Sequence, residues 1–296
     1  MLGLSWFKKN IMVPVPYRLN EKTLRIFATF CDEQTIGRIG FIDVEINNPS
    51  KIVNYSQHPV LDIGGSGNFD DSGVVTASIV EQPGELWIYY SGYHRESHVP
   101  YAILSGLAIS RDNGLTAERR QQAPILPALP GESNTRSGPF VLKESIYRMW
   151  YIGDYSSGWK KDSQGKMLPW YILKYIESDD GITWSQTTPA ISLNFKDEDD
   201  EHGLAKPSIW KEDGVYKMIY SIRTFSKGYR LGYAESADGI EFIRKDDEVG
   251  LTVSESGWDS EMVCFASRYQ YEDKTYLFYC GNGYGLAGLG YAELEI

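Results

Sequence analysis

Two short acidic stretches contain the residues best suited to chemistry. SESGWDSEMVCF (254–265) includes Asp259 and Glu261 just before an apolar run, and NFDDSG includes Asp70 and Asp71 before another. Two carboxylates in unlike surroundings can cleave a glycosidic bond. The ionised one activates water or attacks directly, and the protonated one gives its proton to the leaving oxygen. These acids are therefore the first candidates for catalysis.

Two further stretches precede apolar runs in the same way. EDDEHGLAKP contains Glu201, His202 and Lys206, and NTRSGP contains Arg136. The basic residues Arg136, Lys206 and Arg223 have two interpretations. They neutralise a crowd of acids, or they bind a carboxylate or phosphate on the substrate, since the arginine fork matches such oxyanions.

An internal repeat indicates how these stretches are positioned. Four aromatic-rich segments align, GELWIYYSGY, IYRMWYIGDY, VYKMIYSIRT and TYLFYCGNGY, and TLRIFATFCD is a weaker copy near the start. The alignment makes the following positions equivalent, at intervals of about 60 residues: Ala28, Tyr90, Tyr151, Tyr220 and Tyr279. Each copy lies between two other strand-like segments, and no segment of 12 or more residues has a helical period.

Repeated units of antiparallel strands are typical of propellers. The sequence therefore predicts an all-β fold, a five-bladed β-propeller of four-stranded antiparallel blades, with residues 1–296 forming a single domain. In such a ring the innermost strands all start at the same end of the central channel. Residues far apart in the sequence are then expected to meet at the channel mouth.

This convergence defines the predicted site. The expected catalytic residues are Asp71, Glu261 and Glu201. The expected substrate-binding residues are Asp70, Arg136, Asp154, His202, Lys206, Arg223, Asp259, Asn282 and Tyr284. The alternative interpretation is structural, in which each acid caps a turn through its own backbone.

The chain resembles the five-bladed propeller glycosidases, the superfamily of invertases, levansucrases, arabinanases and xylosidases. Within it, segments such as FDDSG, AKPS, SESGWDSEM and GNGYG are similar to those of bacterial glycosyl-hydrolase-like proteins. The resemblance implies three acids on different blades. Two departures stand out: Asn10 is near the place of the first acid, and Arg136 is followed by Ser137 rather than Asp. With these departures, the resemblance gives the base or nucleophile role to Asp71, or alternatively Asp70, and the acid role to Glu261.

Three segments resemble the Asp box of sialidases: SRDNGLTA, SDDGITW and SADGIEF. In this motif the Asp binds its own turn and the Gly adopts a positive φ. Asp112, Asp180 and Asp238 are therefore predicted to be structural and remote from any chemistry.

Composition narrows the classes of partner. The net charge of −11, from 29 basic and 40 acidic residues, argues against nucleic acid or an anionic membrane. No apolar run in the sequence approaches the length needed to span a membrane. The N-terminus lacks the order of a secretory signal, so we expect a cytoplasmic protein.

Metal and cofactor motifs are missing from the sequence. The four histidines have no metal-ligand spacing, and no Gly-rich phosphate loop opens a helix. We expect no cofactor and no metal. Cys31, Cys264 and Cys280 are expected to be buried thiols, with a disulfide between Cys264 and Cys280 as the alternative.

The function predicted from the sequence is cleavage of a glycosidic bond in a small or anionic saccharide by carboxylate acid/base catalysis. Two alternatives stay open. One is a sugar-binding propeller without catalysis, and the other is a phosphorylase or transferase that uses the same site. The expected partner is a saccharide, and the sequence does not determine the oligomeric state.

Overall fold

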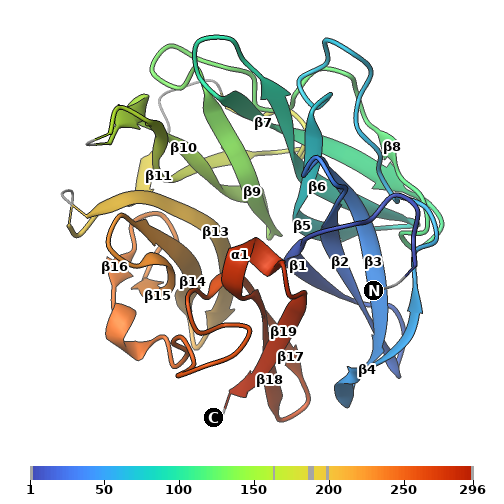
Figure 1. Cartoon of the computed structure of the whole chain (residues 1–296). Coiled ribbons are helices and arrows are strands. Elements are labelled where there is room, and N and C mark those ends of the chain that lie inside the picture. Colours follow the sequence, from blue (N-terminus) through green and yellow to red (C-terminus); the bar gives the residue numbers. More distant parts are fainter. Residues whose placement is uncertain (1–2, 163, 186–189, 198–199, 295–296) are drawn as a thin grey trace.

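The computed structural model describes residues 3–162, 164–185, 190–197 and 200–294, and its regular secondary structure is almost entirely β-strand. Successive strands pair antiparallel, so that each sheet is a meander. Figure 1 shows the sheets arranged around a common centre. The first sheet contains β1 (Ile11–Arg18), β2 (Thr23–Cys31), β3 (Gly37–Glu45) and β4 (Asn48–Tyr55).

The middle of the chain forms three such meanders. One contains β5 (Gly73–Gln82), β6 (Glu85–Arg95), β7 (Tyr101–Ser110) and β8 (Glu118–Arg119). The next contains β9 (Thr135–Lys143), β10 (Tyr147–Lys161), β11 (Met167–Ser178) and β12 (Ala190–Leu193). The third contains β13 (Glu201–Glu212), β14 (Val215–Thr224), β15 (Gly228–Ser236) and β16 (Ile243–Arg244). Parallel bridges from β7 to β9 and from β11 to β13 join them into one sheet.

The last sheet contains β17 (Cys264–Tyr271), β18 (Lys274–Cys280) and β19 (Leu289–Leu294), so within the described residues it has three strands rather than the expected four. The helical elements are short, a 3₁₀ turn η1 (Asp246–Glu248) and α1 (Asn282–Gly285). In the part of the chain that is described, no helix has the length and apolar character needed to cross a membrane.

The innermost strands contact one another in ring order. β1 contacts β5, β5 contacts β9, β9 contacts β13, β13 contacts β17, and β17 contacts β1. The core lies between neighbouring sheets: Phe27 and Phe41 of the first sheet pack with Ile88 and Tyr90 of the next. The prediction of an all-β fold of propeller type is therefore confirmed.

The aligned aromatic residues share one buried role. Each Tyr of the repeat lies on the second strand of its meander and donates its hydroxyl to a carboxylate. The pairs are Tyr90 with Asp70 (2.9 Å), Tyr151 with Glu132 (2.9 Å), Tyr220 with Asp246 (2.5 Å) and Tyr279 with Asp259 (2.8 Å). Burial and the neighbouring carboxylate raise the pKa of all four phenols, which therefore stay neutral donors.

Every innermost strand also has a β-bulge at the same point of its register. The residues at this point are Val13, Thr76, Gly138, Lys206 and Phe265. Val13, Lys206 and Phe265 are non-glycine residues with φ of 55°, 49° and 56°. Such left-handed backbone is costly and persists only where surrounding contacts enforce it.

Side chains of the preceding sheet hold these bulges. Each acceptor lies on a second strand and takes the N–H of the bulge residue in the next sheet. The pairs are Thr29 Oγ1 with Thr76 (3.0 Å), Ser91 Oγ with Gly138 (2.8 Å), Ser221 Oγ with Phe265 (2.8 Å) and Cys280 Sγ with Val13 (3.3 Å). For the bulge at Lys206, the equivalent residue on the preceding meander is Ile152, whose side chain offers no hydrogen-bond acceptor.

The Asp-box prediction is confirmed. Asp112 accepts the N–H groups of Leu115 and Thr116, and Asp180 accepts those of Ile182 and Thr183. Asp238 accepts the N–H of Ile240, and the glycine of each box has a φ between 72° and 81°. The three cysteines are buried free thiols.

We predict that Ser221→Ala destabilises the fold by about 1–3 kcal/mol, because the partly buried N–H of Phe265 loses its acceptor, the hydroxyl of the buried Ser221. Urea unfolding measures this change. Ser97→Ala, at an exposed serine, is the matched control and should stay within about 0.5 kcal/mol. Equal effects of the two substitutions would show that the bulge bond contributes nothing measurable.

Candidate functional site

A cavity of about 350 Å³ opens at the centre of the ring. This volume lies in the range of small-molecule sites. Its lining comes from every sheet and from α1, and combines aromatic, hydroxyl-bearing and apolar side chains. The lining residues are Asn10, Met12, Val13, Cys31, Thr35, Val75, Thr76, Ser91, Tyr93, Tyr101, Ile103, Thr135, Ser137, Gly138, Ile152, Tyr171, Ala205, Lys206, Arg223, Tyr229, Phe265 and Tyr284.

The bulges form the base of this site. All five bulge residues line the cavity, and four of them, Val13, Gly138, Lys206 and Phe265, have the left-handed backbone. Lys206 is the only one of them with a charge. At Gly138 a side chain would meet Ile152 at 2.6 Å, so a close approach as well as a positive φ requires glycine there.

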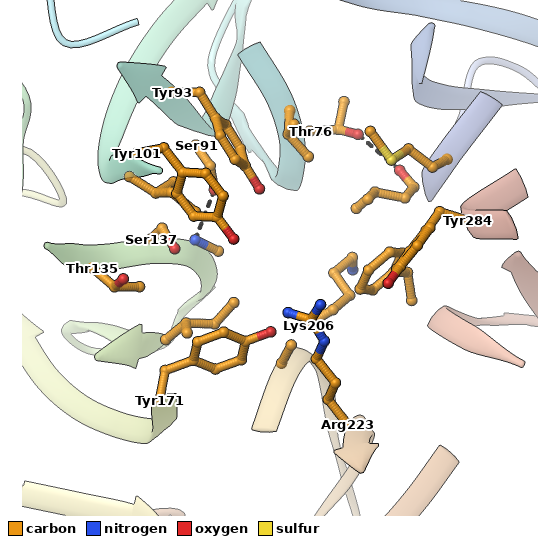
Figure 2. A pocket seen from close by; sticks show the side chains of 18 of the residues that line it. Thr76, Ser91, Tyr93, Tyr101, Thr135, Ser137, Tyr171, Lys206, Arg223 and Tyr284 are labelled. Atoms are coloured by element: carbon orange, nitrogen blue, oxygen red, sulfur yellow. Dashed lines mark hydrogen bonds between the residues drawn. The ribbon is translucent and has the colours of Figure 1, made fainter. Parts of the chain in front are cut away.

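Tyrosines form much of the wall. Tyr93 and Tyr101 lie at the end of β6 and the start of β7 with ring centroids 5.4 Å apart, and the hydroxyls of Tyr171 and Tyr229 are 2.9 Å apart. Figure 2 shows the hydroxyls of Tyr93, Tyr101 and Tyr171 directed toward the space that the Arg223 guanidinium enters. Burial raises the pKa of Tyr101 to about 12 and that of Tyr229 further, so these phenols are neutral at ordinary pH.

The charges in this wall are cationic. Lys206 is 4% exposed, and its Nζ donates to Ser267 Oγ at 2.9 Å. Arg223 lies with its guanidinium carbon 5.5 Å from the ring centre of Tyr229. Among the described lining residues there is no Asp or Glu, and no described carboxylate forms an ion pair with either cation. A ligand is thus the natural source of the balancing negative charge.

Burial without an acidic partner changes the protonation of Lys206. Desolvation lowers the pKa of its ammonium group from 10.5 to about 7. Near neutral pH the charged and the neutral forms of the amine are therefore both populated. Arg223 differs, because burial lowers its pKa but the surrounding phenol oxygens, Tyr229 first, raise it by more, so it stays charged.

Three predicted binding residues lie in this pocket: Lys206, Arg223 and Tyr284. Asn282 lies beside it and holds the rim, since its Oδ1 accepts the N–H groups of Glu261 and Met262 at 2.8 and 3.2 Å. The acidic segment 254–265 is thus anchored to α1.

Three other predicted binding residues are buried in polar pairs inside the sheets. Asp70 accepts from Arg119 (2.7 Å) as well as Tyr90, and Asp259 accepts from Tyr279. Arg136 pairs with Glu132 at 2.8 Å. None of the three lines the pocket.

Asp154 and His202 are buried next to backbone groups. Asp154 accepts the N–H of Asn134 at 2.8 Å, and desolvation raises the pKa of its carboxyl group. The His202 ring stacks on Phe225 with centroids 4.5 Å apart. Burial lowers the pKa of His202 to about 4, so its imidazole is neutral at ordinary pH.

The predicted catalytic acids have three different environments. Asp71 is half-buried and accepts from His94 Nδ1 (2.9 Å), Ser72 Oγ (2.8 Å) and the N–H of Gly67 (2.9 Å). Burial by itself would raise its pKa, but these donors lower it. Its carboxyl group is therefore ionised.

The other two catalytic candidates contrast in exposure. Glu201 is buried, and Arg244 binds both of its oxygens, at 2.6 and 2.7 Å. The Glu261 side chain is exposed on the segment held by Asn282. No described group forms an ion pair with it. Glu198 and Asp199, in the same acidic stretch as Glu201, lie outside the described residues.

Part of the pocket wall was not predicted from the sequence, above all Tyr101, Tyr171 and Tyr229. A signal was present for two of them. YILKY and YRLGY place Tyr171 and Tyr229 at the same point of the third strand, three residues before the partner of the repeat tyrosine. The position of Tyr101 follows from the length of β7, which the repeat does not encode.

We predict that Lys206→Met makes the protein more stable near pH 7, by about 1–3 kcal/mol, because it removes a buried amine. Between the folded pKa of about 7 and the unfolded value of 10.5, the unfolded chain holds more protons on this residue. Wild-type stability therefore gains from rising pH in this window, and the advantage of the variant should shrink.

Urea unfolding of both proteins near pH 7 and near pH 9 measures this change. Lys227→Met, at an exposed lysine, is the control. A difference between wild type and the Lys206 variant that does not depend on pH would contradict the assignment.

No family model matches the chain. The uncharacterised protein MT1551 of Mycobacterium tuberculosis (strain CDC 1551 / Oshkosh) is 29% identical over 293 residues, which cover 99% of this chain and 95% of that protein. This likeness in sequence extends over the whole fold, but the name of the relative describes no activity.

Solved structures with the same fold have named activities. A glycoside hydrolase aligns with a TM-score of 0.76 and 16% identity, over 100% of this chain and 90% of its own. An exo-1,5-α-L-arabinanase from a bovine ruminal metagenomic library aligns with a TM-score of 0.68 and 14% identity, over 100% and 97%. The resemblance expected from the sequence is thus confirmed in the fold: the chain shares the architecture of the β-propeller glycoside hydrolases.

Proposed function

We propose that the protein binds a saccharide in the central pocket and acts on a glycosidic bond there. The observation that carries this proposal is the pocket itself, which combines five tyrosines with two cations at the centre of a glycoside hydrolase fold. Aromatic faces pack on the apolar surfaces of a ligand, and the phenol, serine and threonine hydroxyls supply directional hydrogen bonds.

The proposed architecture is a single domain with five blades. The ring order of the innermost strands and the bond from Val13 N–H to Cys280 Sγ support it, since that bond joins the first sheet to the last. We also propose a cytoplasmic location. The free thiols of Cys264 and Cys280, which are register partners on adjacent strands, favour a reducing compartment.

For the reaction we propose that Asp71 is the base or nucleophile and Glu261 the general acid. Asp71 is ionised and oriented by His94, as a base requires. Glu261 is exposed to solvent on the segment that Asn282 holds. Both oxygens of Glu201 are taken by Arg244, so we assign no proton transfer to it.

A second candidate function is saccharide binding without catalysis. It is favoured by one observation: the described lining contains no carboxylate that could act on a bond held at the centre. The third candidate, a phosphorylase or transferase, needs one acid and a basic cluster for phosphate. Arg223 and Lys206 provide such a cluster.

We predict that Asp71→Asn and Glu261→Gln each reduce turnover by about 100-fold or more, while saccharide affinity changes little. The loss of turnover in the Glu261 variant should be smaller for aryl glycosides than for alkyl glycosides, because a good leaving group needs less protonation by an acid. Initial rates on alkyl and aryl glycosides and calorimetric titration of the sugars measure both effects.

Two exposed acids provide matched controls, Asp213→Asn and Glu33→Gln. If the wild-type protein binds saccharides but turns over no glycoside, the result would favour a saccharide-binding protein without catalysis. Turnover that survives both substitutions would remove these two residues from the reaction.

A further inference from the structure

The most unusual property of the pocket is its charge. The protein as a whole has a net charge of −11, yet the described residues that line the cavity include two basic side chains and no acid. The acids of the neighbouring stretches have other partners: Asp70 binds Arg119 and Tyr90, and Glu201 binds Arg244. The pocket cations are thus left for a ligand.

The two cations come from adjacent strands and line the same pocket. Lys206 lies on β13 and Arg223 on β14, which are antiparallel neighbours. Figure 2 shows both side chains on the same side of the pocket, opposite Tyr93 and Tyr101. An arginine fork binds two oxygens of a planar or tetrahedral oxyanion, a lysine adds a point charge, and neutral phenols donate hydrogen bonds to the remaining oxygens.

We propose that Arg223 and Lys206 bind an oxyanion, a phosphate or a carboxylate, in the central pocket, and that Lys206 takes up a proton as this anion binds. The inference rests on the proposed function, since it names the chemical class of the ligand for that site. The oxyanion has two sources, a substituent on the saccharide or free inorganic phosphate, and both present the same chemistry to these residues.

Proton uptake follows from the surroundings of Lys206. The titratable group that acts on Lys206 is the buried thiol of Cys280 on β18, while Arg223 and the phenols of Tyr171, Tyr229 and Tyr284 line the same pocket. Cys280 raises the pKa of Lys206, but desolvation lowers it by more, and no described carboxylate supplies the missing negative charge before an anion arrives. An oxyanion supplies that charge, and the pKa of Lys206 rises in the complex.

The test is calorimetric titration of wild type with four probes: glucose, glucuronate, glucose 1-phosphate and inorganic phosphate. We expect anionic probes to bind and Arg223→Gln to weaken them about 10- to 100-fold, with little change for glucose. Arg95→Gln, which removes an exposed charge from the end of β6, is the control for general electrostatics.

The protonation step has its own readout. Glucuronate stays ionised above about pH 5, so its affinity for wild type should fall by up to about tenfold per pH unit above pH 7 as Lys206 loses its proton. Titrations in buffers of different ionisation enthalpy should show uptake of a fraction of a proton near pH 7. Lys206→Met, which folds without a buried amine, should abolish both signals, and Lys227→Met should keep them.

The outcomes separate this inference from the proposed function. Equal affinity for glucose and its anionic relatives, or full anion affinity in Arg223→Gln, overturns the inference and leaves saccharide binding in place. Phosphate binding as tight as that of glucose 1-phosphate identifies free phosphate as the ligand and contradicts a saccharide contact in this pocket. Anion binding without proton uptake overturns the role of Lys206 alone.

Discussion

The architecture of the channel depends on the bulge in each innermost strand. A bulge places one residue where a regular ladder would have turned it into the sheet, and here it turns Val13, Thr76, Gly138, Lys206 and Phe265 toward the centre. The left-handed backbone is unfavourable by itself, and at Val13, Gly138 and Phe265 a hydroxyl or thiol from the preceding sheet holds it. One repeated contact therefore joins adjacent sheets and shapes the pocket wall.

The acids of this chain are distributed by the same repeat. A carboxylate buried next to a tyrosine hydroxyl and an arginine satisfies three polar groups at once, as Asp70 shows with Tyr90 and Arg119. This arrangement uses up carboxylates that the sequence places near the channel. What is left at the centre is a set of neutral phenols and two cations, the reverse of the overall charge of the protein.

Much of the fold was predictable because its signal repeats. Alternating aromatic strands, turn glycines and Asp boxes recur at similar intervals, and each copy strengthens the others. The burial and the partners of individual side chains were harder to predict from the sequence. Asp259 and Glu261 are two residues apart, yet one is buried against Tyr279 and the other is exposed. That difference depends on a phenol from another strand, which spacing alone does not reveal. The pocket tyrosines depend likewise on strand lengths.

The bond between Val13 and Cys280 bears on how the molecule is made. It spans 267 positions, whereas each meander pairs strands that are adjacent in the chain. During synthesis each sheet can form as its strands emerge. The contact between the first and last sheets, however, must wait until residue 280 has been synthesised. The first sheet therefore spends most of that time with one side of its innermost strand uncovered. Contacts of such long range are slow to form, so closure of the ring is the step most exposed to aggregation and to chaperone capture.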